Sequence, residues 1–192
     1  MRLIRLILAA LILSISGLSF AQDWIVYVNR AERFSVNFPG EPRVHDMTYM
    51  SERGDTLPAR VYTAQEGPRR YSITVVNYAD TGETVLRAST VRGSIAYAAW
   101  NFRKRGGEVT YDAFAQVDRI EGHQLQITNA DQSRTFVAIH LHARRLYILE
   151  ATVPPGSPPP GQFQQSLYIL DEEGKRIRYN LDHDGNRTTR SR

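Results

Sequence analysis

The sequence predicts an α+β fold: a single domain with an antiparallel sheet of about six to eight strands, flanked by one long and one short helix. Short alternating runs of aromatic and β-branched residues, separated by turn residues, predict strands joined in hairpins. One long stretch with helical periodicity lies in the middle of the chain, and a shorter one lies near its end. Because a doubly wound parallel sheet needs a helix between successive strands, so few helices among so many strands argue against one.

Five strands are predicted before the long helix. In 34–38, Phe34, Val36 and Phe38 alternate with polar residues and share one face, and the Pro-Gly-Glu-Pro turn at 39–42 ends the strand. The other strands of this half are expected at 24–28, 43–51, 58–65 and 71–78, with a hairpin turn at 52–55.

The long helix is expected over 83–105. Asp80 and Glu83 predict a capping box at its start, and Gly106 and Gly107 end it after a basic last turn, where cations suit the helix dipole. Apolar residues that recur at spacings of three and four form one stripe toward the sheet: Ala88, Val91, Ile95, Ala98 and Phe102.

The second half predicts four more strands and a short final helix. The strands are expected at 108–118, 121–129, 133–142 and 145–153. A proline-rich connector at 154–160 then leads to a helix over 162–170, which packs Phe163, Leu167 and Leu170. We interpret the connector as a spacer, with a docking peptide for an aromatic groove as the alternative. Beyond it, 171–192 is a polar tail with a short strand at 176–179.

The first 21 residues have the order of a secretory signal peptide. Arg2 and Arg5 precede an apolar run at 6–13, and small side chains at Ser19 and Ala21 predict cleavage before Gln22. The sequence therefore predicts a signal peptide at 1–21, an α+β domain at 22–170 and the tail at 171–192, in a periplasmic or secreted protein. An uncleaved N-terminal anchor is the alternative, although the apolar run is short for a membrane span.

Composition excludes several functional classes. The chain has no cysteine, which excludes a thiol nucleophile, a cysteine-ligated metal and a lipid-anchored lipoprotein. Arginines are spread along the chain and interleaved with acidic residues, whereas a nucleic-acid binder concentrates its positive charge in one patch. No nucleophile elbow, phosphate-binding glycine loop, dinucleotide fingerprint or zinc-protease motif occurs. We therefore expect no catalytic residues, no cofactor and no nucleic-acid partner.

A metal site is the alternative to a purely structural interpretation of the histidines. His140 and His142 are two residues apart on a predicted strand, so they share a face and could hold a metal if His123 or Glu150 supplied a third ligand. The simpler interpretation places them on the more polar face of a half-buried sheet. The run at 180–185 places oxygen side chains as in a calcium loop, but Ser191 stands where the closing glutamate belongs, which favours an exposed turn.

Two stretches of the chain are similar to a known family. The segment Arg33-Phe34-Ser35-Val36-Asn37-Phe38-Pro39-Gly40-Glu41-Pro42 resembles the start of exported bacterial proteins with the PsbP-like fold. The pattern Phe163-x-x-Ser166-Leu167-x-Ile169-Leu170-Asp171 resembles their closing helix. The resemblance implies a PsbP-like α/β/α sandwich in a protein that binds other proteins and does not catalyse a reaction. It transfers no functional residue, because the matching positions determine a strand, a turn and a helix face.

The function expected from the sequence is that of an exported, soluble, non-catalytic accessory protein, with another envelope protein as its partner. Tyr97, Trp100 and Phe102 crowd one end of the long helix, where an aromatic side chain could anchor that partner. A metal-binding protein or metal-dependent enzyme that uses His140 and His142 is one alternative. The other is a small-molecule binding module that uses the open face of the sheet.

Overall fold

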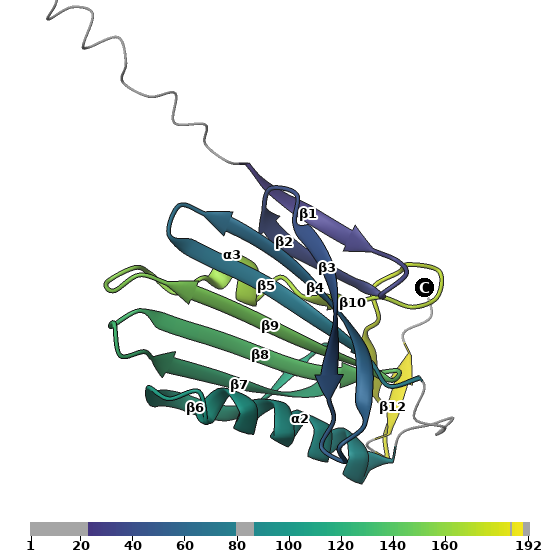
Figure 1. Cartoon of the computed structure of the whole chain (residues 1–192). Coiled ribbons are helices and arrows are strands. Elements are labelled where there is room, and N and C mark those ends of the chain that lie inside the picture. Colours follow the sequence, from purple (N-terminus) through teal and green to yellow (C-terminus); the bar gives the residue numbers. More distant parts are fainter. Residues whose placement is uncertain (1–22, 80–86, 185, 190–192) are drawn as a thin grey trace, which may run out of the picture.

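A computed structural model describes residues 23–79, 87–184 and 186–189, and it confirms the α+β class (Figure 1). The signal peptide predicted at 1–21 and the capping box of Asp80 and Glu83 lie outside these residues. The described elements are β1 (Trp24–Asn29), β2 (Phe34–Pro39), β3 (Arg43–Met50), β4 (Thr56–Glu66), β5 (Arg69–Asn77), α2 (Ala88–Arg103), β6 (Glu108–Val117), β7 (Ile120–Thr128), β8 (Arg134–His142), β9 (Arg145–Val153), α3 (Gly161–Gln164), β10 (Tyr168–Ile169), β11 (Tyr179–Leu181) and β12 (Arg187–Thr189).

The main sheet has seven antiparallel strands in the order β3-β4-β5-β9-β8-β7-β6, within the predicted range of six to eight. Helix α2 packs on one face, which we call the helix face. The opposite face, the strand face, is covered chiefly by a three-stranded sheet of β1, β2 and β10, with α3 beside it. The predicted α/β/α description is therefore not accurate, because the second covering layer is mostly β structure and contains only a single helical turn.

Each face of the main sheet has its own apolar core. On the strand face, Phe34, Val36 and Phe38 of β2 are fully buried against residues such as Tyr62 and Ile73. This confirms the alternation predicted for that strand. On the helix face, the core joins α2 to alternate residues of the main sheet: Leu57, Ala59, Val76, Leu125, Ile127, Val137, Ile139, Leu141, Leu146 and Ile148. Burial of each large apolar side chain contributes about 1.5–3 kcal/mol.

Helix α2 begins at Ala88, five residues after the predicted start, and ends at Arg103. Ile95, Ala98 and Phe102 of the predicted stripe are buried, and Ala99 joins them. The chain then turns through Gly106 and Gly107, whose φ values are +95° and +93°. A Cβ atom at residue 107 would lie 2.7 Å from the carbonyl oxygen of Thr128, so glycine lets the chain pass close to β7.

The final helix predicted over 162–170 is wrong in its extent. Only Gly161–Gln164 is helical, and Tyr168–Ile169 pairs as β10 with the edge of β2. Ser166 explains the change, because its hydroxyl accepts a hydrogen bond from the backbone N–H of Asn37 at 2.8 Å and donates one to the Phe163 carbonyl at 2.8 Å. The first of these bonds satisfies a backbone N–H on the edge of β2, and the second ends the helical turn at Phe163. Phe163, Leu167 and Leu170 are nevertheless buried, as predicted.

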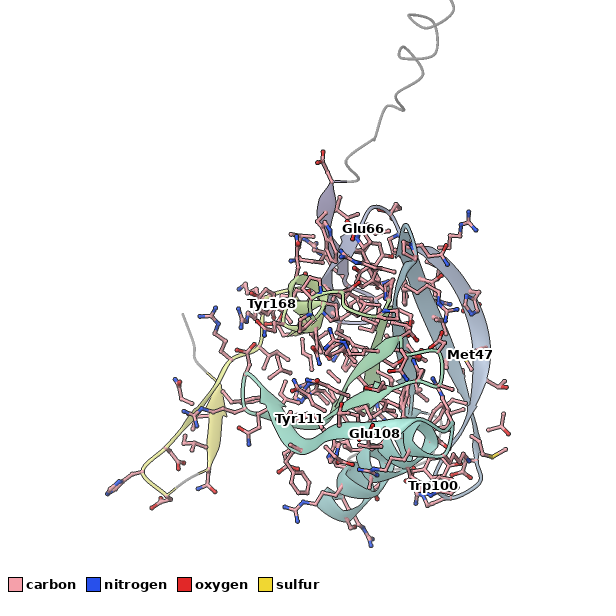
Figure 2. The ribbon with its side chains drawn as sticks, turned by 90° about the vertical axis from the view of Figure 1, so that its left-hand side faces the viewer. Met47, Glu66, Trp100, Glu108, Tyr111 and Tyr168 are labelled. Carbon is pink, nitrogen blue, oxygen red and sulfur yellow. The ribbon has the colours of Figure 1, made fainter. Side chains whose placement is uncertain are left out.

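The segment after residue 170 packs against the domain before it projects away as a hairpin. The guanidinium of Arg176 donates two hydrogen bonds to the Asp118 carboxylate, at 2.7 and 2.9 Å, and covers the ring of Tyr168. Ile177 packs on the strand-face core. The strand predicted at 176–179 lies three residues later, at Tyr179–Leu181, where β11 pairs with β12 (Figure 2).

Two hairpins of the main sheet turn through only two residues, neither of them glycine. Asp118 and Arg119 join β6 to β7 with φ values of 48° and 65°, and Ala143 and Arg144 join β8 to β9 with φ values of 46° and 63°. Two successive positive φ angles are the conformation that suits the twist of a two-residue hairpin. Neither helix in the described ranges is long and apolar enough to span a bilayer.

Candidate functional site

The histidine pair predicted on β8 does share one face, and that face is the strand face. His140 lies opposite Gly122 and Tyr147 in the sheet register and is only 3% exposed. Its Nδ1 atom has no hydrogen-bond partner among the described residues. Burial lowers the pKa of His140 to about 4, so the ring is neutral near pH 7. His140 is thus an interior packing residue and does not lie on the more polar, half-buried face expected from the sequence.

The structure does not bring the proposed third metal ligands to this pair. His123 pairs with Ile139 and Glu150 with Val137, which places both side chains on the helix face, on the other side of the sheet. The Nε2 atom of His142 lies 3.3 Å from the hydroxyl of Tyr179 on β11. No group of three or more His, Asp or Glu side chains with metal-binding geometry occurs within the described ranges. These positions therefore support a structural role for the two histidines better than a metal centre.

The exposed turn predicted for the calcium-like run at 180–185 falls between the paired strands β11 and β12. The Asp182 carboxylate accepts hydrogen bonds from the backbone N–H groups of Asp184 and Asn186, at 3.0 and 2.8 Å. These bonds form the local turn that aspartate favours, and both end on its Oδ1 atom. Gly185 and Ser191, the other positions in the calcium comparison, lie outside the described residues.

The proline-rich connector packs along the domain. The guanidinium of Arg134 donates a hydrogen bond to the Ser157 carbonyl, and Pro160 is buried immediately before α3. Because Ser157 in its middle and Pro160 at its end are held against the domain, this packing fits a spacer that positions α3.

The aromatic residues of α2 separate into a core residue and an exposed pair. Phe102 is 3% exposed and belongs to the helix-face core. Trp100 is 50% exposed, stacks on Tyr97 at a ring distance of 5.7 Å and lies under the Lys104 ammonium at 3.9 Å (Figure 2). The exposed indole is therefore already in contact with Tyr97 of α2 and with Lys104, the residue that follows the helix.

A groove with a largely apolar lining lies between α2 and the edge of the main sheet. This β6 groove has a volume of about 790 Å³, and its lining comes from α2, β6 and β7: Arg92, Ile95, Ala96, Arg103, Phe114, Ala115, Gln116, Glu121, Gly122 and His123. Phe114 projects from edge strand β6 and is 90% exposed, with its ring centroid 5.5 Å from that of His123. The sequence analysis did not identify Phe114, because alternation predicts on which face of a strand a side chain lies but not whether another element covers that face.

A charged network fixes the two walls of the β6 groove. Arg103 of α2 donates hydrogen bonds of 2.7 and 2.9 Å to the Asp112 carboxylate on β6, and His123 Nε2 lies 2.5 Å from the same carboxylate. The hydrogen bonds from Arg103, with a smaller contribution from His123, hold the pKa of Asp112 below its usual range. The network therefore holds α2, β6 and β7 together beside the groove.

A second concave region lies on the part of the helix face that α2 leaves open. Polar residues at alternate positions of β5 and β9 line it, among them Arg70, Ser72, Glu150 and Thr152. Polar residues that alternate along these otherwise apolar strands were a sequence signal for this polar region. The alternation does not predict where the hollow lies, because its location depends on where α2 ends.

The fold described above is similar to that of one solved structure. No family model and no curated protein matches the chain. Among solved structures, the chain is similar to the solution structure of cyanobacterial PsbP (CyanoP) from Synechocystis sp. PCC 6803, with a TM-score of 0.51 and 9% sequence identity. The alignment covers 81% of this chain and 96% of the cyanobacterial protein. At this identity the likeness establishes the fold, and a functional assignment needs support from the surface of this chain.

Proposed function

We propose that the chain is an exported, non-catalytic accessory protein that binds a partner protein through the β6 groove. The observation that carries this proposal is the exposure of Phe114, 90% of whose surface is open to solvent beside an apolar hollow. A large apolar side chain on a rigid strand costs little conformational entropy on binding and buries a large area, as interface anchors do. The PsbP-like fold supports a non-catalytic role.

The groove is already formed in the unbound chain. The Arg103–Asp112–His123 network joins α2 to β6 and β7, so the two walls are fixed relative to each other. Preorganised walls reduce the ordering cost of association. Arg92, which is 74% exposed at the edge of the groove, lies 3.9 Å from Glu121 and provides a polar rim. An apolar centre with a polar rim is the common anatomy of a protein interface.

Site-specific photo-crosslinking in cells tests the proposal. A photoreactive phenylalanine at position 114 is expected to capture one dominant envelope protein. The matched control carries the same group at Val26, which is 68% exposed on β1 and lies outside the groove lining. Capture at residue 114 and not at residue 26 supports the proposal. Recovery of only the free monomer from both positions, or capture of a second copy of the chain at 114, argues against it.

A further inference from the structure

The edge strand β6 is paired on one side only. It stands last in the strand order of the main sheet, and among the described residues its only partner strand is β7 (Figure 2). An edge strand presents a row of backbone N–H and C=O groups to solvent, and these groups can pair with a further strand. The edge runs directly beside the β6 groove, because Phe114, Ala115 and Gln116 belong to the groove lining.

The register of the hairpin shows which backbone groups of β6 are free. Val117 and Ile120 flank the two-residue turn and form a hydrogen-bonded pair, and from there hydrogen-bonded and non-hydrogen-bonded pairs alternate along the two strands. Asp112, Phe114 and Gln116 belong to non-hydrogen-bonded pairs, so their N–H and C=O groups point away from β7. No other backbone group in the described ranges pairs with them.

The stretch 111–117 lacks the devices that usually protect an edge strand, such as proline, lysine or several charged side chains. Its one charged residue, Asp112, is held by Arg103 of α2. A β-bulge between Val109 and Tyr111 interrupts the pairing with β7 and marks the start of the regular edge. By contrast, the opposite edge of the sheet, β3, has three ionisable side chains among its first four residues.

Exposed aromatic side chains flank the free edge on both faces of the sheet. Phe114 lies opposite His123 and is on the helix face. Tyr111 lies opposite Gln126, whose two neighbours in β7 belong to the helix-face core, so the Tyr111 ring is on the strand face, where it is 45% exposed. A strand added beside β6 would therefore find an aromatic ring on each face of the sheet. Such a strand needs apolar side chains at successive positions and not only at every second one.

The free edge fits an extended segment better than a second folded copy of the chain. Its N–H and C=O groups recur at every second residue, which matches the repeat of another extended polypeptide backbone. Free groups on the regular edge span only 112–116, and two folded domains that touch along so short a stretch bury less than the about 1,200 Å² of a stable interface. A segment without a fold of its own can in addition follow β6 and pack its side chains against Phe114 and in the groove.

We infer that the partner of the β6 groove supplies an extended segment, rich in β-branched and aromatic residues, that adds to the main sheet as a strand beside β6. This inference rests on the proposed function, because it assigns the form in which a partner enters the same site. The free backbone groups of Asp112, Phe114 and Gln116 fix the register of the added strand, and the two aromatic rings select its side chains.

One backbone position separates strand addition from binding by side chains alone. Gln116→Pro removes an N–H that points away from β7 and leaves Phe114 and the bonds to β7 in place. Proline is tolerated at such positions of an edge strand. Gln116→Ala is the matched control, because it removes the same side chain and keeps the N–H. The amide spectra of both variants verify that they fold.

The probe is a set of short peptides, selected on the immobilised wild-type protein from a displayed library of random sequences. We expect the selected peptides to be rich in β-branched and aromatic residues. They should bind Gln116→Pro at least about tenfold more weakly than Gln116→Ala, because proline leaves an acceptor of the added strand unpaired. In the complex with the wild type, the amides of Asp112, Phe114 and Gln116 should become protected from hydrogen exchange.

The inference is overturned if no peptide is selected, if the selected peptides bind Gln116→Pro and Gln116→Ala equally, or if the edge joins two copies of the chain in a dimer that Gln116→Pro dissociates. These results differ from a failure of the proposed function. Capture of one envelope partner at residue 114, with equal peptide binding by the two variants, would retain the β6 groove as the site and remove the added strand. Peptides that depend on the Gln116 N–H, without any partner captured in cells, would instead contradict the proposed function.

Discussion

Acidification should destabilise the protein through His140. The ring is 3% exposed, and burial lowers its pKa from 6.5 to about 4. In the unfolded chain the imidazole regains its ordinary pKa and takes up a proton below about pH 6.5. The folded state does not take up that proton until about pH 4. The stabilisation is therefore fully present above pH 6.5 and is lost as the pH falls from 6.5 toward 4.

The size of this effect follows from the two pKa values. Each factor of ten in proton affinity corresponds to 1.36 kcal/mol, so the full effect of a pKa lowered from 6.5 to about 4 is about 3 kcal/mol. Between about pH 7 and pH 5 the expected loss is about 2 kcal/mol. Urea unfolding of the wild type and of His140→Gln at several pH values measures it, because glutamine does not titrate.

The difference in pH dependence between these two proteins isolates His140 from the other titrating groups. We expect His140→Gln to lose about 2 kcal/mol less than the wild type between pH 7 and pH 5. Equal pH slopes for the wild type and His140→Gln would refute the assignment of His140 as a buried neutral ring.

Three further predictions follow from the backbone and the predicted leader. Gly122→Ala should lower the free energy of unfolding by about 1–3 kcal/mol or more in urea unfolding, because its Cβ would overlap His140 Nδ1 and the Ile139 carbonyl oxygen. Gly161→Ala, whose Cβ would meet nothing within 4 Å, should change the free energy of unfolding little, and equal effects of the two substitutions would contradict the packing around Gly122. Ala143→Gly should raise the free energy of unfolding by about 0.5–1 kcal/mol, because φ is 46° at this residue and glycine adopts a positive φ without steric cost. A lower melting temperature of the variant would contradict the positive φ at this turn. Sequencing of the mature protein should begin at Gln22, and an N-terminus at Met1 would favour the retained anchor.

Local periodicity was sufficient to predict most strands and the long helix. Phe34, Val36 and Phe38 alternate because β2 is packed on one face, and Ile95, Ala98 and Phe102 recur because α2 lies on a sheet. The segment at 168–169 could not be predicted in this way. Its conformation depends on the open edge of β2, more than 100 residues earlier in the chain, as the Asn37–Ser166 hydrogen bond shows.

The surfaces that carry the proposals depend on tertiary structure in a way that alternation does not encode. The spacing of His140 and His142 predicted a shared face correctly, but the register that places His123 and Glu150 on the opposite face comes from pairing between strands. The exposure of Phe114 likewise depends on β6 being the edge of the sheet. Alternation says which residues lie together on a strand, and the packing of other elements decides which of those residues meet solvent.

Quantitative co-purification from native envelope fractions tests the central claim most directly, with tagged wild type, Phe114→Ala and Trp100→Ala as baits. Removal of a central aromatic anchor costs at least about 2 kcal/mol of binding free energy, which is about a 30-fold loss of affinity. We predict that one partner is recovered with the wild type and with Trp100→Ala, and that its yield falls sharply with Phe114→Ala. Equal recovery with all three baits, or no partner with any of them, would contradict a function based on the β6 groove.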